Sequence, residues 1–118
     1  MTEPNILSSL SSAFAETIAR AAPAIVSVHS HRARASGFVW KAGLIVTADE
    51  ALADEGEIEI QFADGSRRPA TVVGRDHTTD VALLRVEGDV APVKLSTGSP
   101  ALGSLAVIVA ADRGRADR

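Results

Sequence analysis

Cysteine and tyrosine are both absent from this chain of 118 residues. Without thiols the protein forms no disulfide and performs no cysteine-based catalysis. Aromatic residues make up only 3% of the chain, so its core must be built from valine, isoleucine, leucine and alanine. Because 46% of the residues are hydrophobic, the composition argues against disorder and favours one folded domain.

Strong charge and long apolar runs are also missing. The 15 acidic and 12 basic residues leave a net charge of −3, which gives no general attraction to nucleic acid. No apolar run approaches the roughly 18 residues of a membrane-spanning helix, and residues 1–23 lack the basic start and apolar run of a signal peptide. We therefore expect no nucleic-acid or membrane partner. The expected location is cytoplasmic, or periplasmic if a leader has been removed.

The N-terminal segment has the pattern of an amphipathic helix. Asn5 is a plausible N-cap and Pro23 lies just past the end, which predicts a helix over residues 6–21. Its apolar positions are 6, 7, 10, 14, 18 and 21. Such a helix is expected to cover the fold that follows, with a partner-binding face as the alternative. Residues 1–22 are assigned to this helix and its lead-in.

The hydrophobic period changes to two from Ala24 onward, which is typical of β-strands. Asp64-Gly65 is a strong hairpin signal, and residues 76–79 form a polar turn. Strands are expected within residues 24–30, 36–40, 43–48, 57–62, 68–75, 80–86, 91–95 and 104–110. Short strands at near-regular spacing predict a mainly β fold, a small antiparallel barrel or sandwich after one helix.

Five motifs occur along the chain, and their order can be compared with that in known protein families. They are AAPAIVSV (21–28), SGFVW (36–40), GLIVTADEAL (43–52), FADGSRRPATVVGRDHTTDVALLRVEG (62–88) and VKLSTGSPALGSLAVIVAA (93–111). This order resembles the trypsin-like serine proteases of the HtrA/DegP type. The resemblance implies a chymotrypsin-like fold of two β-barrels. Residues 23–111 would form the first, six- to seven-stranded barrel, and residues 112–118 a tail or the start of the inter-barrel linker.

The resemblance also places two members of a Ser-His-Asp triad. Asp80 in TTDVALL falls on the family's aspartate, and Glu50 in VTADEAL falls on its histidine, 30 residues earlier. The triad base must accept a proton near neutral pH, which imidazole does with a pKa of about 6.5 and glutamate, near 4.3, does poorly. We therefore predict that the chain is catalytically inactive, with Glu50 a solvated turn residue. A substitute base and a metal ligand are its alternative roles.

The family's nucleophile lies in a Gly-Asn-Ser-Gly-Gly-like loop of the second barrel. Ser99 is the one serine flanked by glycines in a loop here, but its segment aligns with the link between the barrels. Pro100 also removes the next backbone N–H from any oxyanion hole. We expect neither a nucleophile nor an oxyanion hole within these residues.

Two groups of residues raise the question of a metal site. Four acidic residues lie close in sequence, Asp49, Glu50, Asp54 and Glu55, but they do not have the spacing of an EF-hand loop. His29 and His31 share a strand face and would supply half of a zinc site, without a third ligand nearby. We therefore predict no metal and no cofactor.

A third histidine, His77 in RDHTTD, suggests a displaced catalytic base. It lies in a turn three residues before Asp80, too far from a serine in another barrel for that role without rearrangement. We do not expect it to be catalytic.

Three functions remain open. The first is a pseudoprotease barrel that binds protein or peptide segments without cutting them. The second is part of an active serine endopeptidase, completed by further sequence or by another chain. The third is a free-standing β-barrel binding module, such as an SH3-like or OB-like unit. The expected partners are protein or peptide segments, and a second copy or second chain that supplies the other barrel.

Overall fold

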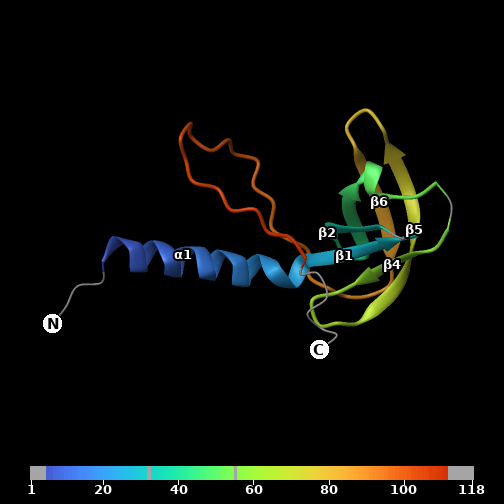
Figure 1. Ribbon diagram of the computed structural model, residues 1–118, viewed down its shortest axis with the longest axis horizontal. Helices are drawn as coiled ribbons and strands as arrows, with labels where there is room; N and C mark the ends of the chain where they lie inside the picture. Colours follow the sequence, from blue (N-terminus) through green and yellow to red (C-terminus); the bar gives the residue numbers. More distant parts are fainter. Residues whose placement is uncertain (1–4, 32, 55, 112–118) are drawn as a thin grey trace.

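The computed structural model describes residues 5–31, 33–54 and 56–111. A helix, α1 (Ile6–Ala21), continues through a short 3-10 turn, η1 (Ala22–Ala24), into a barrel of strands (Figure 1). The strands are β1 (Ile25–Ser30), β2 (Ala33–Lys41), β3 (Leu44–Ala48), β4 (Ile58–Gln61), β5 (Arg67–Asp76) and β6 (Val81–Val86), and a second 3-10 turn, η2 (Asp49–Ala51), follows β3. The predicted mainly β fold after one helix is confirmed.

The six strands form one closed barrel. Each strand is antiparallel to its neighbours, in the order β1–β2–β3–β6–β5–β4. The Asp64-Gly65 signal does mark the β4–β5 hairpin, where Gly65 has the positive φ of 91° that glycine tolerates best. The predicted antiparallel barrel is therefore present, with six strands.

The barrel interior is filled by aliphatic side chains that follow the period of two. In β1 the alternate residues Val26, Val28 and Ser30 are buried. The largest fully buried side chains are those of Ile45, Ile60, Leu84, Val26, Val28 and Val39. This core needs almost no aromatic residue, as the composition requires.

Gly37 allows β2 and β3 to approach closely. A Cβ atom at this position would lie 2.8 Å from the carbonyl oxygen of Val46 and 3.2 Å from Cγ2 of both Ile45 and Val28. Glycine therefore lets two strands and the core side chains meet without a clash. The SGF motif thus has a packing role in this barrel.

The helix does not cover the barrel, so that expectation is wrong. It runs away from the barrel roughly in line with β1 (Figure 1), and none of its residues is buried. The reason is the three-residue connection through η1, which leads α1 straight into β1 and leaves no loop to fold the helix back. Asn5 caps the helix as predicted, because its Oδ1 accepts a hydrogen bond from the Ser8 N–H (2.7 Å). Within the described ranges no helix is long and apolar enough to cross a membrane.

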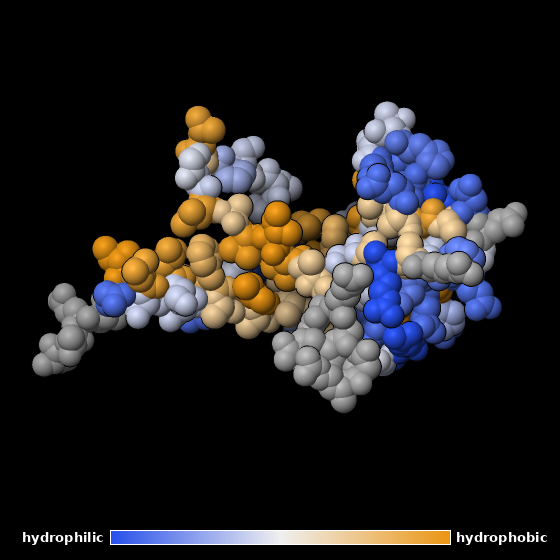
Figure 2. Space-filling view, viewed as in Figure 1, coloured by the Kyte–Doolittle hydropathy of each residue, from blue (hydrophilic) through white to orange (hydrophobic). Residues whose placement is uncertain are grey.

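Residues 87–111 contain no strand, so the two strands predicted at 91–95 and 104–110 are not formed. The segment is tied to β2 where the Val93 N–H donates to the Val39 carbonyl (2.9 Å) and the Ala111 N–H to Ser36 Oγ (2.9 Å). A strand needs a neighbour for its backbone groups, and within the described residues this segment pairs with none of the six barrel strands. Figure 2 shows apolar residues along this loop and the helix, beside a more polar barrel face.

Candidate functional site

The turn that follows β3 lies against the start of β6. Strand β3 pairs with β6 up to Ala48, which lies opposite Val81, and η2 begins at the next residue. Asp80, just before β6, has a φ of 58°, a left-handed conformation that aspartate adopts more readily than most residues. The strand pairing therefore brings residues 49–51 beside Asp80, although 30 positions separate the two segments in sequence.

Two hydrogen bonds join this turn to Asp80. The backbone N–H of Glu50 donates to Oδ1 of Asp80 (2.8 Å), and the N–H of Asp49 donates to the Asp80 carbonyl (3.2 Å). The side chain of Glu50 is exposed to solvent, and Asp80 is half-buried. The two residues that the resemblance assigns to the triad are therefore adjacent, with the Asp80 carboxylate held against the backbone of position 50.

The neighbouring acid, Asp49, has a different environment. Its side chain is only 6% exposed, and its Oδ1 accepts a hydrogen bond from Nε of Arg75 (2.5 Å). Its other oxygen, Oδ2, lies in hydrogen-bond contact with Nδ1 of His77, whose side chain is 78% exposed. Asp49 is thus a buried carboxylate paired with two side chains from β5 and the turn after it.

Arg75 also holds the backbone that follows the turn. Its guanidinium donates to the carbonyl oxygens of Asp49 (3.2 Å), Leu52 (3.3 Å) and Ala53 (3.3 Å). The N–H of Ala53 in turn donates to Oγ of the buried Ser30 (2.9 Å). One arginine side chain therefore fixes η2 and the start of the next loop against β5.

The ion pair sets the protonation of Asp49. The hydrogen bond from Arg75 lowers the pKa of Asp49 below its ordinary value of 3.8, and the contact with His77 acts in the same direction while burial opposes both. Asp49 is therefore ionised at neutral pH. Sequence reasoning missed this cluster, because it treated Asp49 only as one of four acidic residues close in sequence. Its partner Arg75 lies 26 positions away in β5, and no local pattern joins the two.

The predicted acidic group does not gather around a common point. Asp49 is neutralised by Arg75, and Asp54, 96% exposed, lies 3.7 Å from the same guanidinium. Glu55 lies outside the described residues. In the part of the chain that the structure describes, no three side chains of histidine, aspartate or glutamate are placed to hold a metal ion.

The remaining candidates lie apart from this turn. His29 is in β1, where its Nε2 contacts Ser27 Oγ (3.0 Å), and burial followed by the charges of Arg67 and Arg34 lowers its pKa. The expectation that His29 and His31 share a strand face is wrong, because β1 ends at Ser30 and His31 turns with a φ of 53°.

Ser99 is exposed in the segment 87–111, with no strand around it. His77, which is not expected to be catalytic, contacts Asp49.

Comparison with known proteins shows the family of the chain. Residues 35–118 match the family described as the trypsin-like peptidase domain, and this match covers more than half of the chain. The chain belongs to the trypsin-like peptidase family. The resemblance to HtrA-type proteases is also confirmed, because the similar proteins carry that relationship in their names.

Three relatives illustrate the likeness. A probable periplasmic serine endoprotease, DegP-like, of Pseudomonas fluorescens is 42% identical over 59 residues, covering 49% of this chain and 12% of the relative. Serine protease HTRA4 of Mus musculus is 42% identical over 55 residues, covering 46% and 11%. The crystal structure of a serine endoprotease from Yersinia pestis superposes with a TM-score of 0.72 at 27% identity, covering 86% of this chain and 38% of that one.

These relatives correct one prediction. The bacterial proteins of Pseudomonas and Chlamydia are named periplasmic, so the cytoplasmic location expected from the N-terminal residues is wrong. The physical reason is that a few N-terminal residues are a weak indicator of location when the chain spans only about an eighth of the length of such relatives, 12%.

Proposed function

We propose that this chain is the first barrel of an HtrA-type protein that holds polypeptide segments without cutting them. The observation that carries the proposal is Glu50 beside Asp80, at the position where the resemblance places the triad histidine. The endoprotease names of the relatives support polypeptide as the bound class, and their periplasmic location supports the same compartment for this protein.

The chemistry of a carboxylate at position 50 supports the part of the proposal that says the protein does not cut polypeptides. In a Ser-His-Asp triad the imidazole takes the serine proton, while the aspartate binds the opposite ring N–H and orients the ring. A glutamate side chain has no N–H for Asp80 to bind. The backbone N–H of Glu50 does donate to Oδ1 of Asp80, but any residue other than proline at this position would do the same. Ionised glutamate is also a weak proton acceptor near neutral pH.

A second candidate function is an active serine endopeptidase that further sequence or another chain completes. It is favoured by the retained Asp80 and by the hydrogen bonds that hold the turn in place. A third is a free-standing binding module, favoured by the closed barrel with its own core. The first proposal is preferred because it alone follows from the glutamate at position 50. Neither alternative gives a reason for a glutamate where the resemblance places the triad histidine.

The full gene product tests the proposal in two assays. Incubated with unfolded casein, the wild type is expected to bind it, to release no peptides and to leave no serine labelled by a fluorophosphonate probe. If a serine half is supplied elsewhere, Glu50→His is expected to raise peptide release by about 10⁴-fold, the scale on which a triad member acts. Glu50→His combined with Asp80→Asn is the matched control and is expected to lose most of that gain.

Peptide release or stoichiometric serine labelling by the wild type would contradict the predicted absence of cleavage. Failure to retain casein would contradict the binding half.

A further inference from the structure

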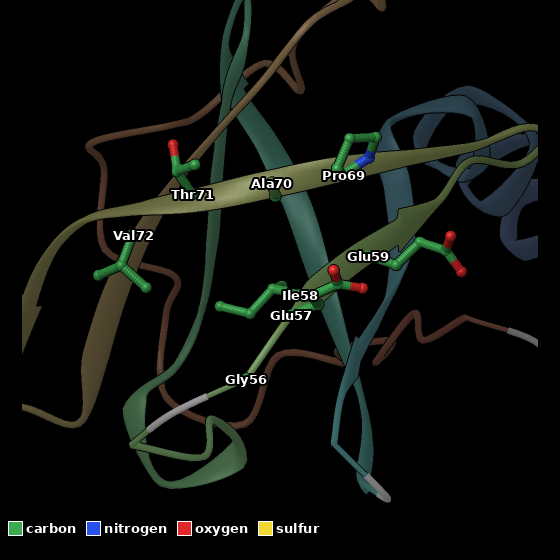
Figure 3. Close-up of a pocket in the computed structure, with 8 residues that line it drawn as sticks. All are labelled: Gly56, Glu57, Ile58, Glu59, Pro69, Ala70, Thr71 and Val72. Carbon is green, nitrogen blue, oxygen red and sulfur yellow. The ribbon is translucent and has the colours of Figure 1, made fainter.

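Strands β4 and β5 diverge on one side of the barrel and leave a hollow. They are paired from Gln61 opposite Arg67 to Ile58 opposite Ala70, where β4 begins. Strand β5 continues to Asp76, and beyond Ala70 its pairing is with β6 alone among the described strands. The hollow that opens there has a volume of about 390 Å³ (Figure 3). It is lined by residues 56–59 and 69–72.

Val72 is an inward-facing residue that the barrel leaves uncovered. It lies directly opposite Leu84 of β6, and residues opposite each other across antiparallel strands share one face. Leu84 is fully buried, yet Val72 remains 43% exposed, since none of the described strands lies on its other side. Figure 3 shows Val72 and Ile58 reaching toward one another across the opening. The hollow thus lies at the edge of the hydrophobic core, where no side chain covers Val72 among the described residues.

The backbone of Val72 also points into the opening. The N–H of Val86 in β6 donates to the carbonyl of Gly43, on the side away from β5. Val86 and Ala70 are therefore a non-hydrogen-bonded pair of the β5–β6 ladder. The N–H and C=O of Ala70 therefore point toward β4. Backbone groups along a strand point to alternate sides, so those of Val72, two residues further on, point to the same side, where β4 no longer continues. Among the described residues, neither group of Val72 has a hydrogen-bond partner on this side. Such a donor and acceptor on an exposed strand edge are the groups to which another strand adds.

The charge of the lining selects the occupant. The eight lining residues include two carboxylates, Glu57 and Glu59, and no lysine or arginine. Glu59 is engaged by Arg67 (3.0 Å), whereas Glu57 is exposed and has no ion pair among the described residues. A bound peptide that places an apolar side chain over Val72 and a neighbouring basic side chain near Glu57 would complement this lining.

We propose that the hollow between β4 and β5 binds an extended polypeptide segment that alternates basic and apolar side chains, by adding it as a strand to the edge at Val72. The inference deepens the proposed binding of polypeptides, on which it rests, by assigning that binding to a surface. It does not depend on whether the protein cuts.

The test measures binding by fluorescence anisotropy with the full gene product and a labelled hexapeptide of alternating lysine and valine. A hexapeptide of alternating glutamate and valine, and the lysine peptide with alternate backbone nitrogens methylated, are the control probes. Both are expected to bind at least about tenfold more weakly, because one opposes the charge and the other lacks the edge hydrogen bonds.

Two variants locate the site. Val72→Pro removes the edge N–H and is expected to weaken the lysine peptide about tenfold. Val72→Thr keeps the N–H but places a hydroxyl in the apolar contact, so it is expected to weaken the same peptide clearly less, by about twofold to threefold. Glu57→Lys is expected to weaken the same peptide about fivefold, while Glu16→Lys, an equal charge change on α1, is expected to have no effect. A thermal melt of each variant shows that it is folded.

The outcomes separate this inference from the proposed function. Equal lysine-peptide affinity in the wild type, Val72→Pro and Glu57→Lys would overturn the assignment to this hollow. So would a wild type that retains casein but binds no hexapeptide, although the polypeptide-binding function would then stand. A wild type that retains neither casein nor any hexapeptide would overturn both.

Discussion

Asp49 and Glu50 are chemically similar neighbours with opposite roles. Asp49 turns its carboxylate into the protein, where Arg75 and His77 contact both oxygens. Glu50 turns its carboxylate to solvent and engages Asp80 only through its backbone N–H. Asp49 therefore stabilises the fold, whereas the Glu50 side chain remains accessible to a molecule that approaches the turn.

Replacing Arg75 with methionine is expected to destabilise the barrel. The change leaves the Asp49 carboxylate without its main partner and frees three carbonyl groups that the guanidinium now binds. Removing one member of a buried ion pair is far more costly than removing a surface pair, so we expect the melting temperature to fall by about 5 °C or more. Differential scanning calorimetry measures this.

Arg67→Met is the matched control, because its partner Glu59 and Arg67 itself are both nearly half exposed. It is expected to shift the melting temperature by less than about 2 °C. Equal shifts in the two variants would show that the Arg75 cluster does not stabilise the turn.

Acid is expected to destabilise the protein in part through Asp49. Arg75 holds the pKa of Asp49 below 3.8, with a smaller contribution from His77. A carboxyl group whose pKa is lower when folded stabilises the protein above its ordinary pKa, and this contribution is lost as the pH falls through the folded value. The pKa values of Asp64 and Asp76 are also lowered, by hydrogen bonds of their own.

The melting temperature of the wild type should therefore fall between about pH 5 and about pH 2. Asp49→Asn should show a smaller fall over the same range, measured by circular dichroism. Parallel curves for the two proteins would contradict the assignment to Asp49.

At the scale of elements, the strands depend on one another while α1 stands apart. Strand β2 contacts β3 so closely that only glycine fits at position 37, whereas α1 buries no residue. The barrel and the helix are therefore expected to respond independently to substitution.

Gly37→Ala is expected to destabilise the barrel by about 2 kcal/mol, because the new methyl group would meet the Val46 carbonyl and two core side chains. Gly74→Ala is the control. It also lies in a strand, and apart from its chain neighbours no described residue comes within 4 Å of the point where its methyl group would lie. Urea denaturation of both variants gives the comparison, and similar losses would argue against a close approach at Gly37.

Asn5→Ala is expected to weaken α1 by about 1 kcal/mol through loss of the cap bond to Ser8. Far-ultraviolet circular dichroism should report less helix, while the main melting transition of the barrel stays where it is. A matched fall in the barrel transition would mean that helix and barrel unfold together.

The elements also show how far the sequence was informative. Helix α1 and the strands around Val26, Ile45 and Leu84 follow from periodicity, because each pattern is local. The strand predicted at 104–110 has the right pattern but no neighbour to pair with. The Arg75–Asp49 ion pair joins residues 26 positions apart, and no local pattern indicates a contact of that length.

At the scale of the whole molecule, apolar surface is concentrated away from the barrel. Leu102, Leu105 and Ile108 in the C-terminal loop are 105%, 71% and 95% exposed, and Ile6 and Leu7 of α1 are exposed as well. Soluble monomers seldom leave so many large apolar side chains uncovered. We propose that a second barrel or a second copy covers this surface.

The 118-residue chain alone is therefore expected to self-associate at micromolar concentration, and Leu102→Glu with Ile108→Glu is expected to reduce the association. Analytical ultracentrifugation of the two proteins measures this. A monodisperse wild-type monomer with one cooperative melt would instead favour the free-standing binding module.

The bond between Glu50 and Asp80 has a consequence for substitution at position 50. Since the donor is a backbone N–H, every amino acid except proline can make it. The turn therefore keeps its contact with Asp80 whatever side chain stands there. Exchanging that side chain changes the chemical group presented at the turn without disturbing the fold beneath it.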